Sequence, residues 1–263
     1  VENYMVFSSL EFIFLFLPIF LFTYYRAPFS KKNLILFLGS IVFYGWGALE
    51  NPEYLIFFLL TILMNFVLGQ AMETFPKMKK GLLIFALIYN IFPLALFKIT
   101  INNIILPVGI SFFTFQNLSY VFDVYYGKAR AERSLVNYGA YISMFPQLIA
   151  GPIITYNEIR TQLRKRSITW KHTKVGIVYF VLGLGAKVLI ANRIGGLWHD
   201  ITKIGYESIT TQLAWMGIIA YCLQLYFDFW GYSLMALGMG RMLGFRFPKN
   251  FDAPYRSTTM SQF

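Results

Sequence analysis

Asp228 is the residue of this sequence that most suggests substrate chemistry, because it interrupts the longest apolar run. It lies in Leu-Tyr-Phe-Asp-Phe-Trp-Gly-Tyr-Ser at positions 225–233. An ionisable group inside an apolar segment is costly and needs either a partner or a function. We favour a carboxylate that lines a cavity and binds or orients a substrate group. The alternative is a structural anchor that pairs with a neighbouring helix, for example through Lys187.

Two glutamines lie where the sequence predicts an irregular backbone. Gln116 follows Pro107 and Gly109, which suit an irregular helix start, and Gln147 lies in Phe-Pro-Gln-Leu-Ile-Ala-Gly-Pro at positions 145–152. The two prolines and the glycine of that stretch predict a broken backbone. Gln147 would then donate to a substrate or satisfy freed carbonyl groups, and Gln116 would join helices or line a cavity.

Residues that usually carry hydrolytic or metal chemistry are scarce. His172 and His199 lie in connections, without a paired carboxylate, so we interpret both as solvated or interfacial rather than as general bases. The sequence has no His-Glu-x-x-His pattern, and Cys222 is its single cysteine, so we predict no metal site. The Gly-x-Ser-x-Gly pattern of a nucleophile elbow is also missing from the sequence.

Composition indicates which elements must position these groups. Of the 263 residues, 57% are hydrophobic and 13% are charged, whereas soluble domains have roughly 25% charged residues. The sequence therefore predicts an all-α, polytopic transmembrane protein, organised as a single membrane domain over residues 1–263. We attribute the formal net charge of +11 to basic cytoplasmic loops and not to nucleic-acid binding.

Seven apolar runs are long enough to be candidate membrane spans. They cover Ser8–Tyr25, Asn33–Ala48, Tyr54–Met72, Gly81–Phe97, Ile104–Tyr126, Val175–Ala191 and Leu213–Gly240. Most of the 23 Lys and Arg residues fall in alternate connections, which the positive-inside rule places in the cytoplasm. This alternation predicts an N-terminus outside the cytoplasm and an outer connection over Asn192–Gln212.

The less apolar stretch 134–154 is predicted to be re-entrant. The connection that follows it, Thr155–Lys174, is the most basic of the chain. If residues 134–154 crossed the bilayer, those positive charges would lie outside, against the positive-inside rule. Non-helical backbone at membrane depth persists only where protein or a wet cavity covers it, and we interpret a re-entrant segment here as a sign of a cavity.

At this point the sequence resembles a known family, the membrane-bound O-acyltransferase superfamily, and within it the alginate O-acetyltransferase membrane subunits. The resemblance covers nearly the whole chain in order, and the combination of motifs is specific. It is carried by residues 5–10, 43–47, 106–116, 145–152, and 226–233 running on through 240–251.

The resemblance implies transfer of an acyl group, usually acetyl, to an extracytoplasmic polysaccharide or cell-wall polymer. It implies an acyl thioester donor such as acetyl-CoA as a substrate, no bound cofactor, and a location in the bacterial inner membrane. Family members carry a buried histidine that serves as general base or acyl relay. The family's Trp-Arg-Arg-Trp-His motif and a second histidine would come after Phe263, so we expect no catalytic residue in this chain and interpret it as the N-terminal portion of such an enzyme.

The residues that carry over from the family are tunnel and scaffold positions, whose individual roles the resemblance does not assign. They are Gln116, Gln147, Gly151, Pro152, Asp228, Tyr232 and Ser233. The expected partners are the lipid bilayer, the acyl donor, and an extracytoplasmic acetyltransferase or polymer acceptor, without nucleic acid. The alternative function is a non-catalytic membrane scaffold that docks an outer-face acetyltransferase.

Overall fold

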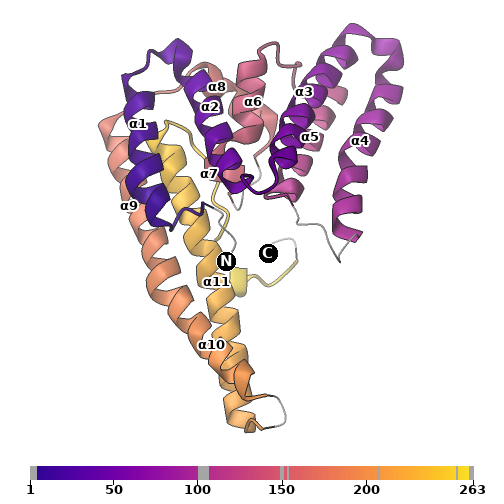
Figure 1. Cartoon of the computed structure of the whole chain (residues 1–263). Coiled ribbons are helices and arrows are strands. Elements are labelled where there is room, and N and C mark those ends of the chain that lie inside the picture. Colours follow the sequence, from indigo (N-terminus) through magenta and orange to yellow (C-terminus); the bar gives the residue numbers. More distant parts are fainter. Residues whose placement is uncertain are drawn as a thin grey trace. The chain divides into compact units, whose positions relative to one another are not determined.

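The computed structural model describes residues 5–99, 107–148, 151–152, 154–205, 208–252 and 254–260. The described residues form helices joined by turns, without strands among them, which confirms the predicted all-α class (Figure 1). Contacts divide the chain into two compact units. Unit 1 comprises residues 1–149 and 153–166, and unit 2 comprises residues 150–152 and 167–263. The single membrane domain predicted from the sequence stays a prediction.

The described residues of unit 1 form eight α-helices, a π-helix and a 3₁₀-helix. In chain order these are η1 (Glu11–Phe16, the π-helix), α1 (Leu17–Arg26), α2 (Phe29–Gly47), α3 (Pro52–Thr74), η2 (Pro76–Met78, the 3₁₀-helix), α4 (Lys79–Ile99), α5 (Ile110–Tyr125), α6 (Leu135–Ser143), α7 (Phe145–Leu148) and α8 (Tyr156–Arg164). Unit 2 holds α9 (Trp170–Gly185), η3 (Ala186–Ala191, a π-helix), α10 (Asn192–Ile204), α11 (Thr211–Met242) and η4 (Pro254–Arg256, a 3₁₀-helix).

Four helical runs of the described residues are long and apolar enough to cross a membrane: Pro52–Thr74, Pro76–Ile99, Trp170–Ile204 and Thr211–Met242. Helix α5, within the predicted span Ile104–Tyr126, has 16 residues. At a rise of 1.5 Å per residue it is about 24 Å long, shorter than the roughly 30 Å of a hydrocarbon core. Residues 104–106 of that predicted span lie outside the described residues.

Serine and threonine side chains fix where the helices begin after the loops. Ser134 Oγ accepts from the backbone N–H of Asn137 at the start of α6, at 3.3 Å, and Thr210 Oγ1 accepts from that of Leu213 at the start of α11, also at 3.3 Å. These N-caps satisfy backbone donors that have no partner within their own helix. The local sequence therefore sets where α6 begins, at the start of the predicted re-entrant stretch, and where α11 begins, in the last helix hairpin.

The stretch 134–154 enters and leaves unit 1 at the same end. The hydroxyl of Tyr156, just after the stretch, donates to Glu132 Oε2, just before it, over 2.5 Å. Glu132 Oε1 accepts from the backbone N–H groups of Arg133 and Ser134 at 2.9 and 3.1 Å. The nine residues of α6 give only about 14 Å of helix, too little for a crossing. The two ends of the stretch thus lie together, as a re-entrant course requires, and its place in the membrane stays a prediction.

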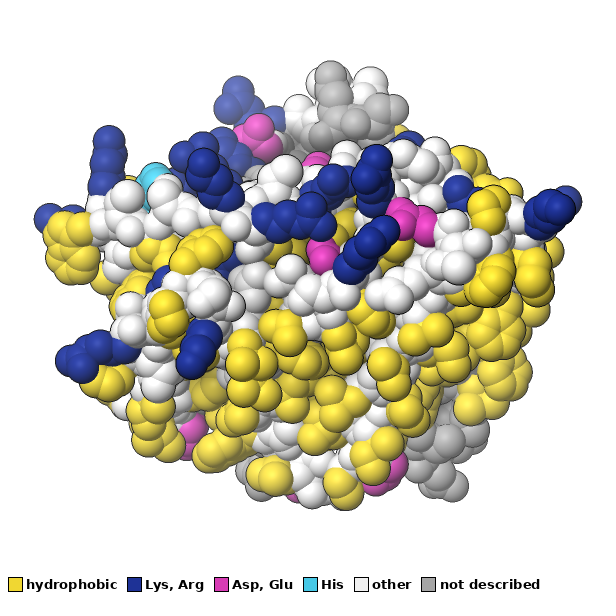
Figure 2. All heavy atoms as spheres, turned by 90° about the horizontal axis from the view of Figure 1, so that it is seen from above, with side chains coloured by type: hydrophobic (Ala, Val, Ile, Leu, Met, Phe, Trp, Pro, Cys, Tyr) yellow, Lys and Arg dark blue, Asp and Glu magenta, His cyan; other side chains and the backbone are white. Residues whose placement is uncertain are grey.

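Hydrogen bonds gather the predicted cytoplasmic connections of unit 1 at this end. The guanidinium of Arg166 donates to the hydroxyl of Tyr24 at 2.8 and 3.0 Å, and Lys32 Nζ donates to the carbonyl of Tyr24 at 2.6 Å. Glu73 Oε1 accepts from the backbone N–H of Ala131 at 2.6 Å. This end of unit 1 is at the top of Figure 1, and the view from above in Figure 2 shows a face on which Lys and Arg side chains gather.

Unit 2 is built on a long antiparallel helix hairpin. A Cβ atom added at Gly176 would lie 2.5 Å from the carbonyl oxygen of Gly238, and one added at Gly231 would lie 2.7 Å from that of Gly183. Small residues at these positions allow α9 and α11 to pack backbone against backbone. Gly183 lies directly against the backbone of α11, whereas Gly185 meets nothing within 4 Å.

The predicted outer connection Asn192–Gln212 is helical over its first part, where α10 continues to Ile204, and its side of the membrane stays a prediction. The apolar run of the sequence ends before α10, but α10 still packs against α11. Trp198 of α10 lies against Tyr221 of α11, with ring centroids 5.0 Å apart. The helical run Trp170–Ile204 therefore has 35 residues, about 52 Å of helix.

We expect that single cysteines at Thr161 and Lys171, introduced with Cys222 replaced by serine, are shielded from an impermeant label added outside intact cells. Both residues are exposed, so shielding would report the side of the membrane and not burial. A cysteine at exposed Lys203, on the predicted outer side, is the positive control. Labelling of position 161 from outside would contradict the predicted orientation.

Alanine at Gly183 is expected to lower the free energy of unfolding by about 1–3 kcal/mol, because its Cβ would collide with the backbone of α11. Gly185→Ala is the matched control. It adds the same methyl group two residues later, where nothing lies within 4 Å of the new Cβ atom. The free energy of unfolding should then stay the same or rise by up to about 1 kcal/mol. Equal unfolding free energies for the two variants in detergent would argue against close packing at Gly183.

Candidate functional site

The predicted break in the backbone is present between α6 and α7. Helix α6 ends at Ser143, Met144 has φ −45° and ψ 102°, and α7 is a single turn of four residues that carries Pro146. Every residue from Tyr138 to Leu148 is buried. The non-helical backbone here is therefore covered by the protein of the helix bundle itself.

Both predicted glutamines of unit 1 satisfy the same backbone carbonyl. Gln116 Nε2 and Gln147 Nε2 donate to the carbonyl oxygen of Tyr141 at 3.0 and 3.1 Å. That carbonyl is in the last turn of α6, where the break removes its partner within the helix. The N–H of Phe145, after the break, donates to Ser40 Oγ at 3.2 Å. The two amides thus take the structural role that the sequence left open beside a substrate role.

The side-chain oxygen of Gln147 is available for a further interaction. The side chain is 3% exposed, and its Oε1 has no hydrogen-bond partner among the described residues. The same holds for the hydroxyl of the fully buried Ser143, one turn earlier. Because an unpaired buried acceptor costs roughly 1–3 kcal/mol, these two oxygens are the atoms of the broken segment best suited to receive a donor from a ligand or a water molecule.

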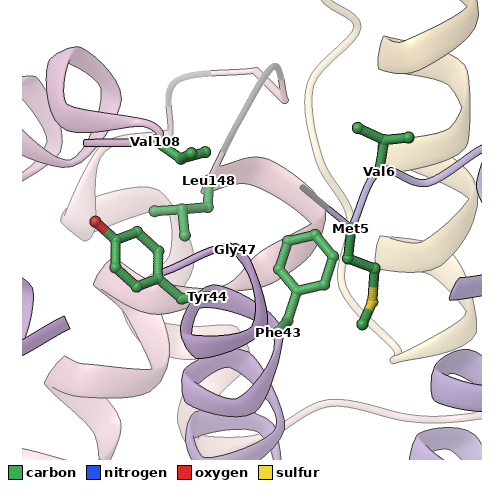
Figure 3. Close-up of a pocket in the computed structure, with 7 residues that line it drawn as sticks. All are labelled: Met5, Val6, Phe43, Tyr44, Gly47, Val108 and Leu148. Atoms are coloured by element: carbon green, nitrogen blue, oxygen red, sulfur yellow. The ribbon is translucent and has the colours of Figure 1, made fainter. Parts of the chain in front are cut away.

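An apolar pocket of about 170 Å³ lies beside the broken segment in unit 1 (Figure 3). Its described lining residues are Met5, Val6, Phe43, Tyr44, Gly47, Val108 and Leu148. Leu148 follows Gln147 directly and belongs to α7, while Phe43 and Tyr44 come from α2. The size and the lining of this pocket suit a small apolar group, such as the methyl end of a short acyl chain.

Phe145 anchors the broken segment in a cluster of aromatic rings. Its ring centroid lies 5.0, 5.4 and 5.6 Å from those of Phe20, Phe16 and Phe43. The rings of Phe20 and Phe16 meet it edge to face, and edge-to-face pairs add about 0.5–1.5 kcal/mol each beyond the burial of their area. The segment that carries Gln147 is therefore held by packing as well as by hydrogen bonds.

Asp228 in unit 2 contacts Lys187, and the pair forms an ion pair between α11 and the π-helix η3. The side chain of Lys187 is 18% exposed and that of Asp228 is 47% exposed. The structural anchor through Lys187, which the sequence analysis weighed against a cavity-lining carboxylate, is the interaction present here. Since π-helical turns occur often at functional sites, the anchor does not by itself remove a functional role.

The remaining predicted positions are also located by the structure. Tyr232 and Ser233 follow Asp228 on α11 and are buried, at 7% and 2% exposure, and Ser233 Oγ has no partner among the described residues. Gly151 and Pro152 are buried and belong to unit 2. Gln116 and Gln147 belong to unit 1, so the seven positions do not form one described site, and their shared tunnel stays a prediction.

Sequence reasoning missed the polar cluster around Glu132, which is 3% exposed. Burial and the hydrogen bond to Glu132 raise the pKa of the Tyr156 hydroxyl well above its ordinary value, so it remains a donor at neutral pH. Arg164 lies 3.5 Å from the same carboxylate, and Tyr120 accepts from the backbone N–H of Glu132 at 3.1 Å. The only sequence signal was an acidic residue within a basic connection, which is too common to single out.

Asp123 has a structural role at the start of α8. Its Oδ2 accepts from the backbone N–H of Asn157 at 3.4 Å, in the first turn of α8. A carboxylate at this position also faces the positive end of the helix dipole. Among the described residues, no three His, Cys, Asp or Glu side chains come together as a metal site would need.

Long apolar helices around a buried, broken segment define a polytopic helical membrane protein. The sequence profile of the membrane-bound O-acyltransferase family, MBOAT, matches residues 128–263, more than half of the chain. The chain therefore belongs to this family.

Among curated proteins, the chain is 37% identical over 267 residues to the probable alginate O-acetylase AlgI of Pseudomonas fluorescens, covering 98% of this chain and 53% of the relative. It is 36% identical to the protein of the same name from Pseudomonas aeruginosa, with the same coverage. It is 31% identical to the peptidoglycan O-acetyltransferase of Helicobacter pylori, covering 98% of this chain and 58% of the relative. The chain thus spans about half the length of these relatives.

A double-mutant cycle tests the anchor role of Asp228. Asp228→Asn and Lys187→Met should each lower the free energy of unfolding, and the double variant should lose less than the sum. We expect a coupling free energy of about 1 kcal/mol, because the carboxylate is nearly half exposed.

The cycle is measured by equilibrium unfolding in detergent micelles. Arg193→Met with Asp228→Asn is the control cycle, since Arg193 is an exposed basic residue of the same helical run. A coupling free energy near zero for Lys187 and Asp228 would show that the carboxylate is not held by this pair.

Proposed function

We propose that this chain forms part of a membrane O-acyltransferase that transfers an acyl group, usually acetyl, toward an extracytoplasmic polysaccharide or cell-wall polymer. The observation that carries the proposal is the alignment of 98% of the chain with an alginate O-acetylase and with a peptidoglycan O-acetyltransferase. The two names describe O-acetylation of alginate and of peptidoglycan. In this proposal a cytoplasmic thioester such as acetyl-CoA is the donor and no cofactor is bound.

The described residues would contribute binding and positioning to this reaction. The apolar pocket beside α7 suits a short acyl group, and the unpartnered Oε1 of Gln147 can accept a hydrogen bond from a ligand that reaches the broken segment. The general base or acyl relay would be a histidine of the family motif expected after Phe263. Removal of the acceptor proton is therefore assigned to that histidine and to no residue of this chain.

The proposal also fixes the compartment and the partners. It places the protein in the bacterial inner membrane with the N-terminus outside, so that the basic end of unit 1 faces the cytoplasm. An extracytoplasmic acetyltransferase or the polymer itself would receive the acyl group on the opposite side. Separation of donor and acceptor by the bilayer gives a reason for a buried path through the protein, because a polar thioester and a polysaccharide do not enter lipid.

A chimera tests the proposal. Residues 1–263 are joined to the part of the Pseudomonas fluorescens relative that this chain does not cover, and the chimera is expressed in a strain that lacks that relative. We expect polymer-bound acetyl groups to be restored by the chimera. The 263-residue chain alone, inserted at equal levels, should give no transfer above background because it lacks the family histidines.

Three results separate the possibilities. Robust acetylation by the 263-residue chain alone would contradict the role of the later histidines. A chimera that inserts stably but transfers no acetyl, while the chain copurifies with an extracytoplasmic acetyltransferase, would favour the non-catalytic scaffold. A chimera whose histidine motif is replaced by alanine is the negative control for the restored activity.

A further inference from the structure

A basic pocket of about 350 Å³ lies in unit 2 at the end of the helix hairpin where α9 begins and α11 ends. The antiparallel contact of Gly176 with Gly238 brings these two helix ends together. The described lining residues are His172, Arg241, Gly244, Phe245, Arg246 and Phe247. Two guanidinium groups and an imidazole thus share one cavity, and none of the six residues is acidic.

The backbone around the pocket is fixed by the way α11 ends. Gly244 has φ +86°, the left-handed conformation that glycine adopts without strain. The N–H of Phe245 donates to the carbonyl of Gly240 at 2.8 Å, and the N–H of Gly244 donates to that of Arg241 at 3.1 Å. This turn directs the chain back so that Arg246, beyond the helix, lines the same cavity as Arg241, within it.

One basic group of the pocket, that of Arg241, is held in place by a neighbouring ring. The guanidinium of Arg241 lies over the ring of Tyr179, 4.9 Å from its centroid. His172 lies in the first turn of α9, where its backbone N–H donates to the capping Thr169 Oγ1 at 3.3 Å. Donors that are already held in place lose less conformational freedom on binding, so they contribute more to affinity than mobile surface lysines do.

We propose that this pocket binds a phosphate group. Two arginines present planar sets of donors that match phosphate oxygens, and a histidine adds a further donor. A phosphate has enough oxygens and charge to engage three such groups, whereas a single carboxylate has two oxygens and one charge. The volume is at the small end of the roughly 300–1,000 Å³ of ligand pockets, which suits a phosphate and part of the group that carries it.

The position of the pocket limits where the phosphate comes from. It lies at the end of two helical runs that are long and apolar enough to cross a membrane, and so at the edge between apolar and polar surroundings. The phosphate can belong to an anionic lipid headgroup or to a soluble phosphorylated molecule, such as a coenzyme thioester. The site is inferred from unit 2 alone and does not depend on acyl transfer.

Binding of inorganic pyrophosphate to the full 263-residue chain tests the proposal, with the chain in nanodiscs of zwitterionic lipid and titration followed by calorimetry. Arg241→Gln and Arg246→Gln should each weaken binding about tenfold or more, since each removes charge-assisted hydrogen bonds. Arg256→Gln is the matched control, because it removes the same charge from an exposed residue of unit 2 outside the pocket.

A second set of titrations separates the sources of the phosphate. Displacement of pyrophosphate by coenzyme A identifies a soluble ligand, and displacement by phosphatidylglycerol built into the nanodiscs identifies a lipid headgroup; either supports the phosphate site. Arg246 lies on the exposed chain after α11, so Arg246→Gln remains informative if Arg241→Gln fails to fold. Equal affinity of the wild type and Arg246→Gln, or an equal loss with Arg256→Gln, overturns the proposal.

Discussion

The need to satisfy backbone groups at the break between α6 and α7 organises unit 1. A helix that ends inside an apolar bundle exposes carbonyl and N–H groups that neither lipid nor apolar side chains can pair. Here Gln116 and Gln147 supply donors for the carbonyl of Tyr141, and Ser40 accepts from the N–H of Phe145. The rings around Phe145 then hold the segment in place, so hydrogen bonding and packing favour the same backbone course.

Unit 2 satisfies its backbone groups in a different way. Its helices remain continuous, so the backbone is satisfied internally, and glycines at positions such as 183 and 231 bring two backbones into contact. The charge of Asp228 is matched by Lys187 across the helix pair. At the end of the hairpin, around Arg241, basic residues line a cavity that polar surroundings can reach.

Much of the fold could be predicted from the sequence, because membrane proteins obey few and strong rules. The prediction that residues 134–154 do not cross the membrane followed from the positive charges after that stretch, and the link of Glu132 to Tyr156 fits a chain that returns to the end where it began. The role of Gln147 could not be predicted. An amide in a broken segment is equally suited to a freed carbonyl and to a ligand, and only the position of Tyr141 distinguishes the two.

The amino-acid sequence by itself determined the membrane class, the family and the place of the backbone break, since apolar length, charge sidedness and proline position act locally along the chain. The tertiary structure alone decided which groups meet. Glu132 gains its partners only when the two ends of a re-entrant stretch close, and α10 extends past its apolar run only because α11 offers Tyr221 to Trp198. The basic cavity at His172 and Arg241 likewise exists only because residues distant in the sequence lie at one end of an antiparallel helix pair.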